Sequence, residues 1–146
     1  MGSLTLNEIL ITPLAEFQLL EGNVLHGLKS TDTGYEKFGE IYFSWINHGS
    51  IKAWKMHTKM VMNLIVPVGQ VKFVFFVNND TTENKFREIE IGERNYQRLT
   101  VPAGIWFGFK GLGKTKSLVC NISNILHSEN EVIRKHLDAV SFDWNL

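Results

Sequence analysis

The stretch from Gly49 to Phe76 constrains the fold more than any other part of the chain. It reads GSIKAWKMHTKMVMNLIVPVGQVKFVFF. Its first apolar run is too short and too interrupted to span a membrane. A Pro-Val-Gly turn signal and a second run, rich in Val and Phe, follow, and this pattern predicts a β-hairpin of two buried strands. Polar and aromatic groups precede the first strand: Trp54, Lys55, His57 and Lys59. The mouth of a β core is where a ligand site is expected.

Length and composition describe an ordinary single domain. The 146 residues are enough for one domain with its own core, so we expect residues 1–146 to form one unit. Aromatic residues make up 12%, which favours β structure. Lys plus Arg and Asp plus Glu number 15 each, so no overall field favours nucleic acid or a membrane as partner.

The single cysteine, Cys120, lies in an apolar, strand-like run and has no intrachain partner for a disulfide. A buried thiol in a reducing compartment is the simplest interpretation. The chain opens without a recognisable secretory signal, and no apolar run reaches about 18 residues. We therefore expect a cytoplasmic protein.

Short strands separated by turn signals dominate the rest of the chain. Residues 38–47 alternate, with Glu40 and Tyr42 on one face, so this strand directs a carboxylate toward an enclosed or wet space. About nine or ten strands predict a sandwich or barrel, with a jelly roll favoured. A capping box at Ser128 and Glu131 predicts one short helix over residues 128–137. Residues 1–17 form a candidate arm that pairs with a partner subunit.

Two spaced motifs resemble those of the cupins, which are double-stranded β-helix jelly rolls. The first is Gly49, five residues, Lys55-Met56-His57, four residues, Met62, six residues and Gly69; the second is Pro102-Ala-Gly104-Ile-Trp-Phe107. The turn residues match, whereas only His57 remains of the four metal-binding positions. Because a metal needs three or four converging donors, we expect neither a metal nor another cofactor.

Within the cupins, residues 38–144 resemble the dTDP-4-dehydrorhamnose 3,5-epimerases and their relatives in nucleotide-sugar pathways. The matching segments are Phe38-x-Glu40-x-Tyr42, the approach to His57, NLIVPVGQVKFVFFVN, LTVPAGIWFGF and VSFDW. The resemblance implies a metal-independent epimerase or isomerase that acts on a nucleotide-linked 4-keto-6-deoxy sugar, for carbohydrate biosynthesis such as that of lipopolysaccharide. It also implies a homodimer.

The resemblance assigns His57 as the base that removes a proton alpha to the C4 ketone, and Lys59 or Lys55 as the cation beside the enolate oxygen. Candidate substrate-binding residues are Glu40, Tyr42, Trp54, Asn63, Trp106 and Phe107. The aromatic members of this group have an alternative role in the core, and Glu40 has one as a partner of a lysine.

Two departures favour an alternative, a non-catalytic module that binds a sugar or a nucleotide sugar. The family's Asp partner of the histidine is expected after the GFxxL segment, where Gly113-Lys114-Thr115 offers no carboxylate. The family's Tyr that returns a proton is expected near residues 124–127, where this sequence has no Tyr. His127 either takes its place or is merely solvated.

Overall fold

The structure, a computed structural model, describes residues 4–77 and 85–145. The described residues form two five-stranded sheets and one two-stranded ribbon. The strands are β1 (Leu10–Pro13), β2 (Glu16–Phe17), β3 (Val24–Leu25), β4 (Glu40–Ile46), β5 (Ile51–His57), β6 (Met62–Val68), β7 (Gln70–Phe76), β8 (Phe86–Gly92), β9 (Gln97–Val101), β10 (Trp106–Gly111), β11 (Ser117–Ser123) and β12 (Val132–Arg134).

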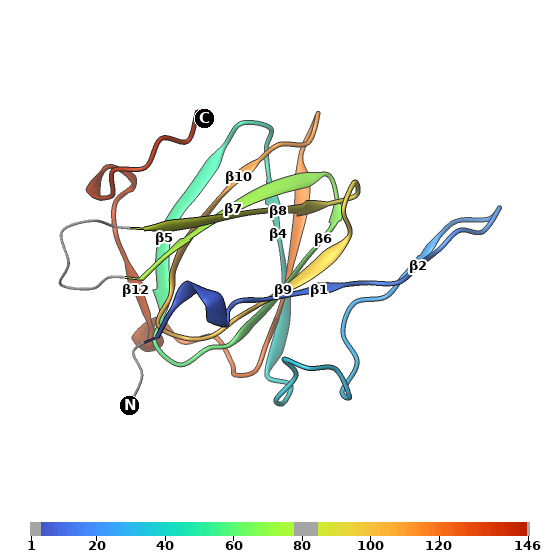
Figure 1. Cartoon of the computed structure of the whole chain (residues 1–146), viewed down its shortest axis with the longest axis horizontal. Helices are drawn as coiled ribbons and strands as arrows, with labels where there is room; N and C mark the ends of the chain where they lie inside the picture. The colour runs from blue at the N-terminus through green and yellow to red at the C-terminus, as the bar shows by residue number, and fades with distance from the viewer. Residues whose placement is uncertain (1–3, 78–84, 146) are drawn as a thin grey trace.

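The two larger sheets face each other across one apolar core (Figure 1). The first sheet has the order β1-β9-β6-β11-β4 and the second has the order β12-β5-β10-β7-β8, with every pairing antiparallel. Val66, Phe73 and Phe75 are fully buried between them. The all-β cupin jelly roll expected from the sequence is confirmed.

The predicted hairpin between the two apolar runs is wrong, although both strands exist. β6 pairs with β9 and β11 in the first sheet, whereas β7 pairs with β8 and β10 in the second. Gly69, with a φ of 85°, turns the chain from one sheet into the other. A turn signal alone does not reveal whether the strands that it joins are paired.

The predicted C-terminal helix is also wrong. Residues 128–137 contain a 3-10 turn at Glu129–Glu131, then β12, and a second 3-10 turn begins at Leu137. Ser128 does accept a hydrogen bond from the Asn130 N–H, as a cap should. The helix does not form because β12 pairs with the edge of β5, and this pairing satisfies the backbone groups that a helix would have used.

The final residues cover the outer face of the second sheet. Phe142 and Trp144 pack against Trp54, with ring centroids 6.3 Å and 5.3 Å from it. The Trp54 indole N–H donates to the Leu137 carbonyl at 3.4 Å. These rings belong to an outer aromatic cluster of Trp54, Phe76, Phe86, Trp106, Phe142 and Trp144. The cluster packs against β5 on the side opposite the core.

The N-terminal residues behave in two ways. Ile9 is buried and β1 pairs with β9 of the same chain, so the described part of residues 1–13 belongs to the chain's own first sheet. The ribbon of β2 and β3 instead projects from the body of the molecule (Figure 1) and exposes Phe17 and Leu20. No helix among the described residues is long and apolar enough to cross a membrane.

Candidate active site

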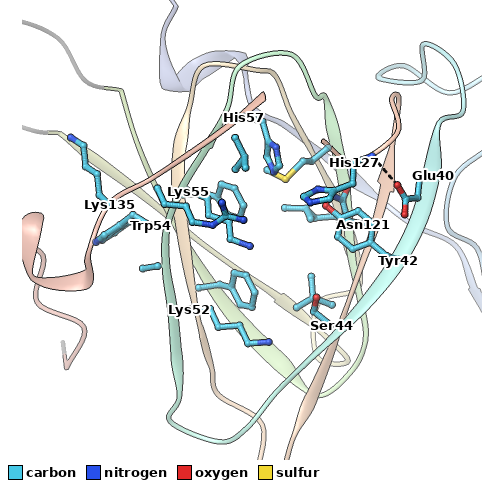
Figure 2. Close-up of a pocket in the computed structure, with 18 residues that line it drawn as sticks. Glu40, Tyr42, Ser44, Lys52, Trp54, Lys55, His57, Asn121, His127 and Lys135 are labelled. Carbon is cyan, nitrogen blue, oxygen red and sulfur yellow. Dashed lines mark hydrogen bonds between the residues drawn. The ribbon is translucent and has the colours of Figure 1, made fainter. Parts of the chain in front are cut away.

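A pocket of about 550 Å³ opens between the two sheets, where β4 of the first faces β5 of the second (Figure 2). That volume falls within the range of small-molecule sites. The apolar part of the wall is Ala53, Trp54, Met62, Leu64, Phe107, Phe109, Val119 and Val132. The polar part is Glu40, Tyr42, Ser44, Lys52, Lys55, His57, Asn121, His127, Arg134 and Lys135.

His57, the last residue of β5, is 5% exposed and lines the pocket. Its Nδ1 lies 2.5 Å from Oε1 of Glu131, and its ring stacks on Phe107 at a centroid distance of 5.9 Å. A carboxylate at Nδ1 holds the proton on that nitrogen, which leaves the lone pair on Nε2. Glu131 therefore supplies the tautomer control that the sequence motif lacked.

Glu131 is held as an anion in a buried position. Its Oε2 accepts hydrogen bonds from the backbone N–H groups of Lys59 and Met60 at 3.3 and 3.2 Å. Burial opposes ionisation, but the hydrogen bond and charge of His57, together with these N–H groups, lower the pKa of Glu131 overall. A buried carboxylate that remains charged is suited to stabilise an imidazolium.

Four basic side chains from β5, β12 and the residue after β12 line the same wall as His57: Lys52, Lys55, Arg134 and Lys135. Lys52 donates to the Trp45 carbonyl at 2.7 Å, while the Lys135 ammonium lies 4.7 Å from the centroid of the Trp106 ring. Lys55 makes no hydrogen bond or ion pair with any described residue. Burial, then the charges of Arg134 and Lys52, lower the pKa of Lys55. This wall is electrostatically prepared for an anion.

A second polar wall comes from the first sheet. The Tyr42 hydroxyl accepts a hydrogen bond from Asn121 Nδ2 at 2.8 Å, and burial raises the pKa of Tyr42. Glu40, two residues earlier on the same face of β4, accepts a hydrogen bond from the backbone N–H of His127 at 2.9 Å. The alternation noted in β4 thus directs its polar face into the pocket and leaves Phe43 and Trp45 exposed.

The structure brings together His57, Lys55, Glu40, Tyr42, Trp54 and Phe107 of the residues selected from the sequence. Trp54 adds to the wall, but its ring belongs to the outer aromatic cluster. Tyr42 and Phe107 present their side chains on opposite sheets. Grouping residues that are far apart in sequence is what the jelly roll contributes.

Three selected residues lie outside the pocket lining. Asn63 faces the other side of β6, where its Oδ1 accepts from Thr100 and Arg98 at 2.6 and 3.1 Å. Trp106 packs in the outer cluster, stacked on Phe76. Lys59 is exposed and contributes only its backbone N–H, which donates to Glu131.

Sequence reasoning missed Glu131, Asn121, Lys52, Arg134 and Lys135. Glu131 had a visible signal, because it was identified as a capping residue in the segment SENE. Its pairing with His57, 74 positions away, depends on β12 lying beside β5. Among the described residues, no group of three or more His, Cys, Asp or Glu side chains is placed to hold a metal ion.

Comparison with known proteins identifies the family. A dTDP sugar isomerase from Desulfovibrio desulfuricans G20 has 32% sequence identity and a TM-score of 0.88, over 94% of this chain and 91% of that one. The chain belongs to the RmlC-like cupin family of sugar epimerases and isomerases.

Two curated relatives agree with this placement in the RmlC-like cupins. The probable low-salt glycan biosynthesis epimerase Agl13 of Haloferax volcanii is 26% identical over 132 residues, which is 85% of each chain. The spore coat polysaccharide biosynthesis protein SpsL of Bacillus subtilis is 25% identical over 117 residues, covering 75% of this chain and 77% of SpsL. No protein-family model matches the sequence.

Proposed function

We propose that this protein is an epimerase or isomerase that acts on a dTDP-linked 4-keto-6-deoxy sugar by removing a proton alpha to the ketone. The observation that carries the proposal is the buried pair of His57 and Glu131 on the wall of a pocket of suitable size. An imidazole whose Nδ1–H is held by a carboxylate presents Nε2 as a base near neutral pH.

The proton balance of the first step is simple. Nε2 of His57 takes the proton, and the C–H bonding pair moves into the enolate. The imidazolium that results lies against the Glu131 carboxylate, so its charge is compensated in a buried place. No metal is needed for this step, and the positions that carry metal ligands in other cupins hold Lys55, Met62 and Phe107 here.

The basic wall supports a negatively charged substrate. Lys55 has a lowered pKa because it is partly desolvated beside Arg134 and Lys52, and an anion at this wall would relieve both effects. The diphosphate of a nucleoside diphosphate sugar carries negative charge next to the sugar. The Lys55 ammonium, two residues before His57 on β5, also suits the enolate oxygen, whereas Lys59 lies outside the pocket lining.

The alternative, a binding module without catalysis, rested on two departures, the missing carboxylate partner of the histidine and the missing Tyr acid. Glu131 answers the first of them, since it holds His57 as the missing Asp was expected to do. Product analysis separates the two functions. The protein is incubated with a panel of dTDP-linked 4-keto-6-deoxy sugars, and new stereoisomers or keto isomers are identified by chromatography and NMR. Tight dTDP-sugar binding by calorimetry without any new product would favour the module.

We also propose a homodimer. The outer face of β4, an edge strand of the first sheet, exposes Ile41, Phe43 and Trp45 by 44%, 60% and 46%. The projecting ribbon exposes Phe17 and Leu20 by 52% and 102%. Apolar surface of this kind is suited to a second copy of the chain. Of the arm expected at residues 1–17, only Glu16–Phe17 belongs to the ribbon strands.

A further inference from the structure

The pocket contains a second histidine paired with a glutamate. His127 lines the wall on the side of Glu40 (Figure 2). Its Nε2 lies 3.0 Å from Oε1 of Glu129. Glu129 also accepts hydrogen bonds from Arg134 at 2.8 and 3.4 Å. One short segment, residues 127–131, therefore supplies His127 and the carboxylate partners of both histidines.

The backbone and the carboxylate fix the position of His127. Its N–H donates to Glu40 at 2.9 Å, which ties the loop after β11 to β4. The hydrogen bond with Glu129 places the ring proton on Nε2 and leaves the lone pair on Nδ1. Glu129 remains ionised, because the hydrogen bonds from Arg134 and then His127 lower its pKa to about 2.

We infer that His127 is the second acid–base residue of the reaction, the one that returns a proton to the enolate from the side opposite His57. This inference rests on the proposed function and deepens it. In its protonated form, His127 gives the Nδ1 proton to the alpha carbon. The enolate pair re-forms the C–H bond, and the ring becomes neutral. His57 holds the proton it removed, so exchange of one proton with solvent at each histidine completes the cycle.

The environment favours His127 over Tyr42 for this role. The side chain of His127 is 43% exposed, so it can be reprotonated from solvent after each turnover. Tyr42 lies deeper and its pKa is raised by burial, so the phenolate left after donation would be destabilised. The Tyr42 hydroxyl donates its proton to the Met60 sulfur, at 3.8 Å, while its oxygen accepts from Asn121.

The two half-reactions separate the roles of the histidines. Wild type, His127→Gln and Tyr42→Phe are incubated with dTDP-4-keto-6-deoxyglucose in deuterium oxide, with His136→Gln, a surface histidine outside the pocket, as the matched control. Deuterium uptake at the alpha carbon is followed by NMR, and product by chromatography. We expect His127→Gln to keep exchange near the wild-type rate, by return of deuterium from His57, and to lose product formation by about 10²-fold or more.

Each other outcome has a definite meaning. Product formation by His127→Gln at the wild-type rate overturns the inference, and loss of product only in Tyr42→Phe assigns the proton to Tyr42 instead. Loss of exchange and product together in His127→Gln also overturns it, because His127 would then act before or with His57. If wild type neither exchanges nor converts the sugar, the proposed function fails, and this inference fails with it.

Discussion

Nδ1 of His57 and Oε1 of Glu131 lie 2.5 Å apart, and both side chains are at least 94% buried. Two residues 74 positions apart are brought together by the pairing of β12 with β5, in register Val132 to His57. A short edge strand thus holds the carboxylate against the His57 imidazole. The hydrogen bonds from Lys59 and Met60 fix the other carboxylate oxygen.

Glu131→Gln should disable the base without removing it. A carboxamide cannot compensate the charge of the His57 imidazolium, and it does not enforce the Nδ1–H tautomer as a carboxylate does. We expect proton abstraction to slow by about 10²-fold or more, measured as deuterium uptake from solvent. Glu131→Asp is the matched control, since it keeps the charge. A Gln variant as fast as wild type would contradict the assignment.

The same pair sets an acid limit to stability. The pKa of Glu131 in the folded protein is lower than the 4.5 of the free group, so its ionisation stabilises the fold above pH 4.5. As pH falls below 4.5, the unfolded chain takes up a proton that the folded chain does not, and the stabilisation declines until the folded-state pKa is reached. We expect the difference in Tm between wild type and Glu131→Gln to shrink over that window. A constant difference would contradict this.

Substitutions at Lys55 and Lys59 test whether the basic wall of the pocket binds an anion. Both were candidates from the sequence, but only Lys55 lines the pocket. Lys55→Met should weaken dTDP binding by about tenfold, which is the loss of about 1.4 kcal/mol and typical of one charge-assisted contact. Lys59→Met should leave the affinity unchanged. Isothermal titration calorimetry with dTDP tests this, and equal effects of the two substitutions would remove Lys55 from the site.

The C-terminal aromatic residues should contribute to stability rather than to chemistry. Trp144 is 8% exposed and packs on Trp54. Trp144→Ala should therefore lower the free energy of unfolding by about 3 kcal/mol, as measured by chemical denaturation. Leu126→Ala, at a side chain that is 71% exposed, is the control and should change it little. A small effect at Trp144 would show that the segment packs loosely.

The projecting ribbon should control oligomeric state. Phe17→Ser combined with Leu20→Ser removes apolar side chains that are 52% and 102% exposed. We expect wild type to sediment as a dimer and the double variant to dissociate at a concentration at least tenfold higher. Ser substitutions at exposed positions leave the core intact, so thermal stability of the monomer is the control. A wild-type monomer would contradict the proposed homodimer.

The fold was predictable from the sequence, because turn residues and strand alternation are local patterns. The turn at Gly69 and the alternation in β4 can be recognised without knowing which strands pair. What failed depended on tertiary partners. β6 and β7 pair with strands from other parts of the chain, and residues 132–134 form an edge strand beside β5. These partners are distant in sequence, so local patterns do not reveal them.

The same reason explains the errors within the site. Asn63 occupies a strand whose two faces are distinguishable only once the opposite sheet is in place. Asn63 faces a cluster with Arg98, a fully buried residue that also donates to the Gly27 and Thr33 carbonyls. An asparagine in an apolar run marks a buried polar contact, but the run does not show whether that contact is a ligand or a loop.

Position-resolved proton NMR of dTDP-4-keto-6-deoxyglucose in deuterium oxide tests the central claim most directly. The account requires wild type to remove the proton signal at C3 or C5, the two carbons beside the ketone, faster than the protein-free control. It requires His57→Asn to leave both signals at the protein-free rate. Signals that persist with wild type, or that disappear equally fast with His57→Asn, would contradict proton abstraction by His57.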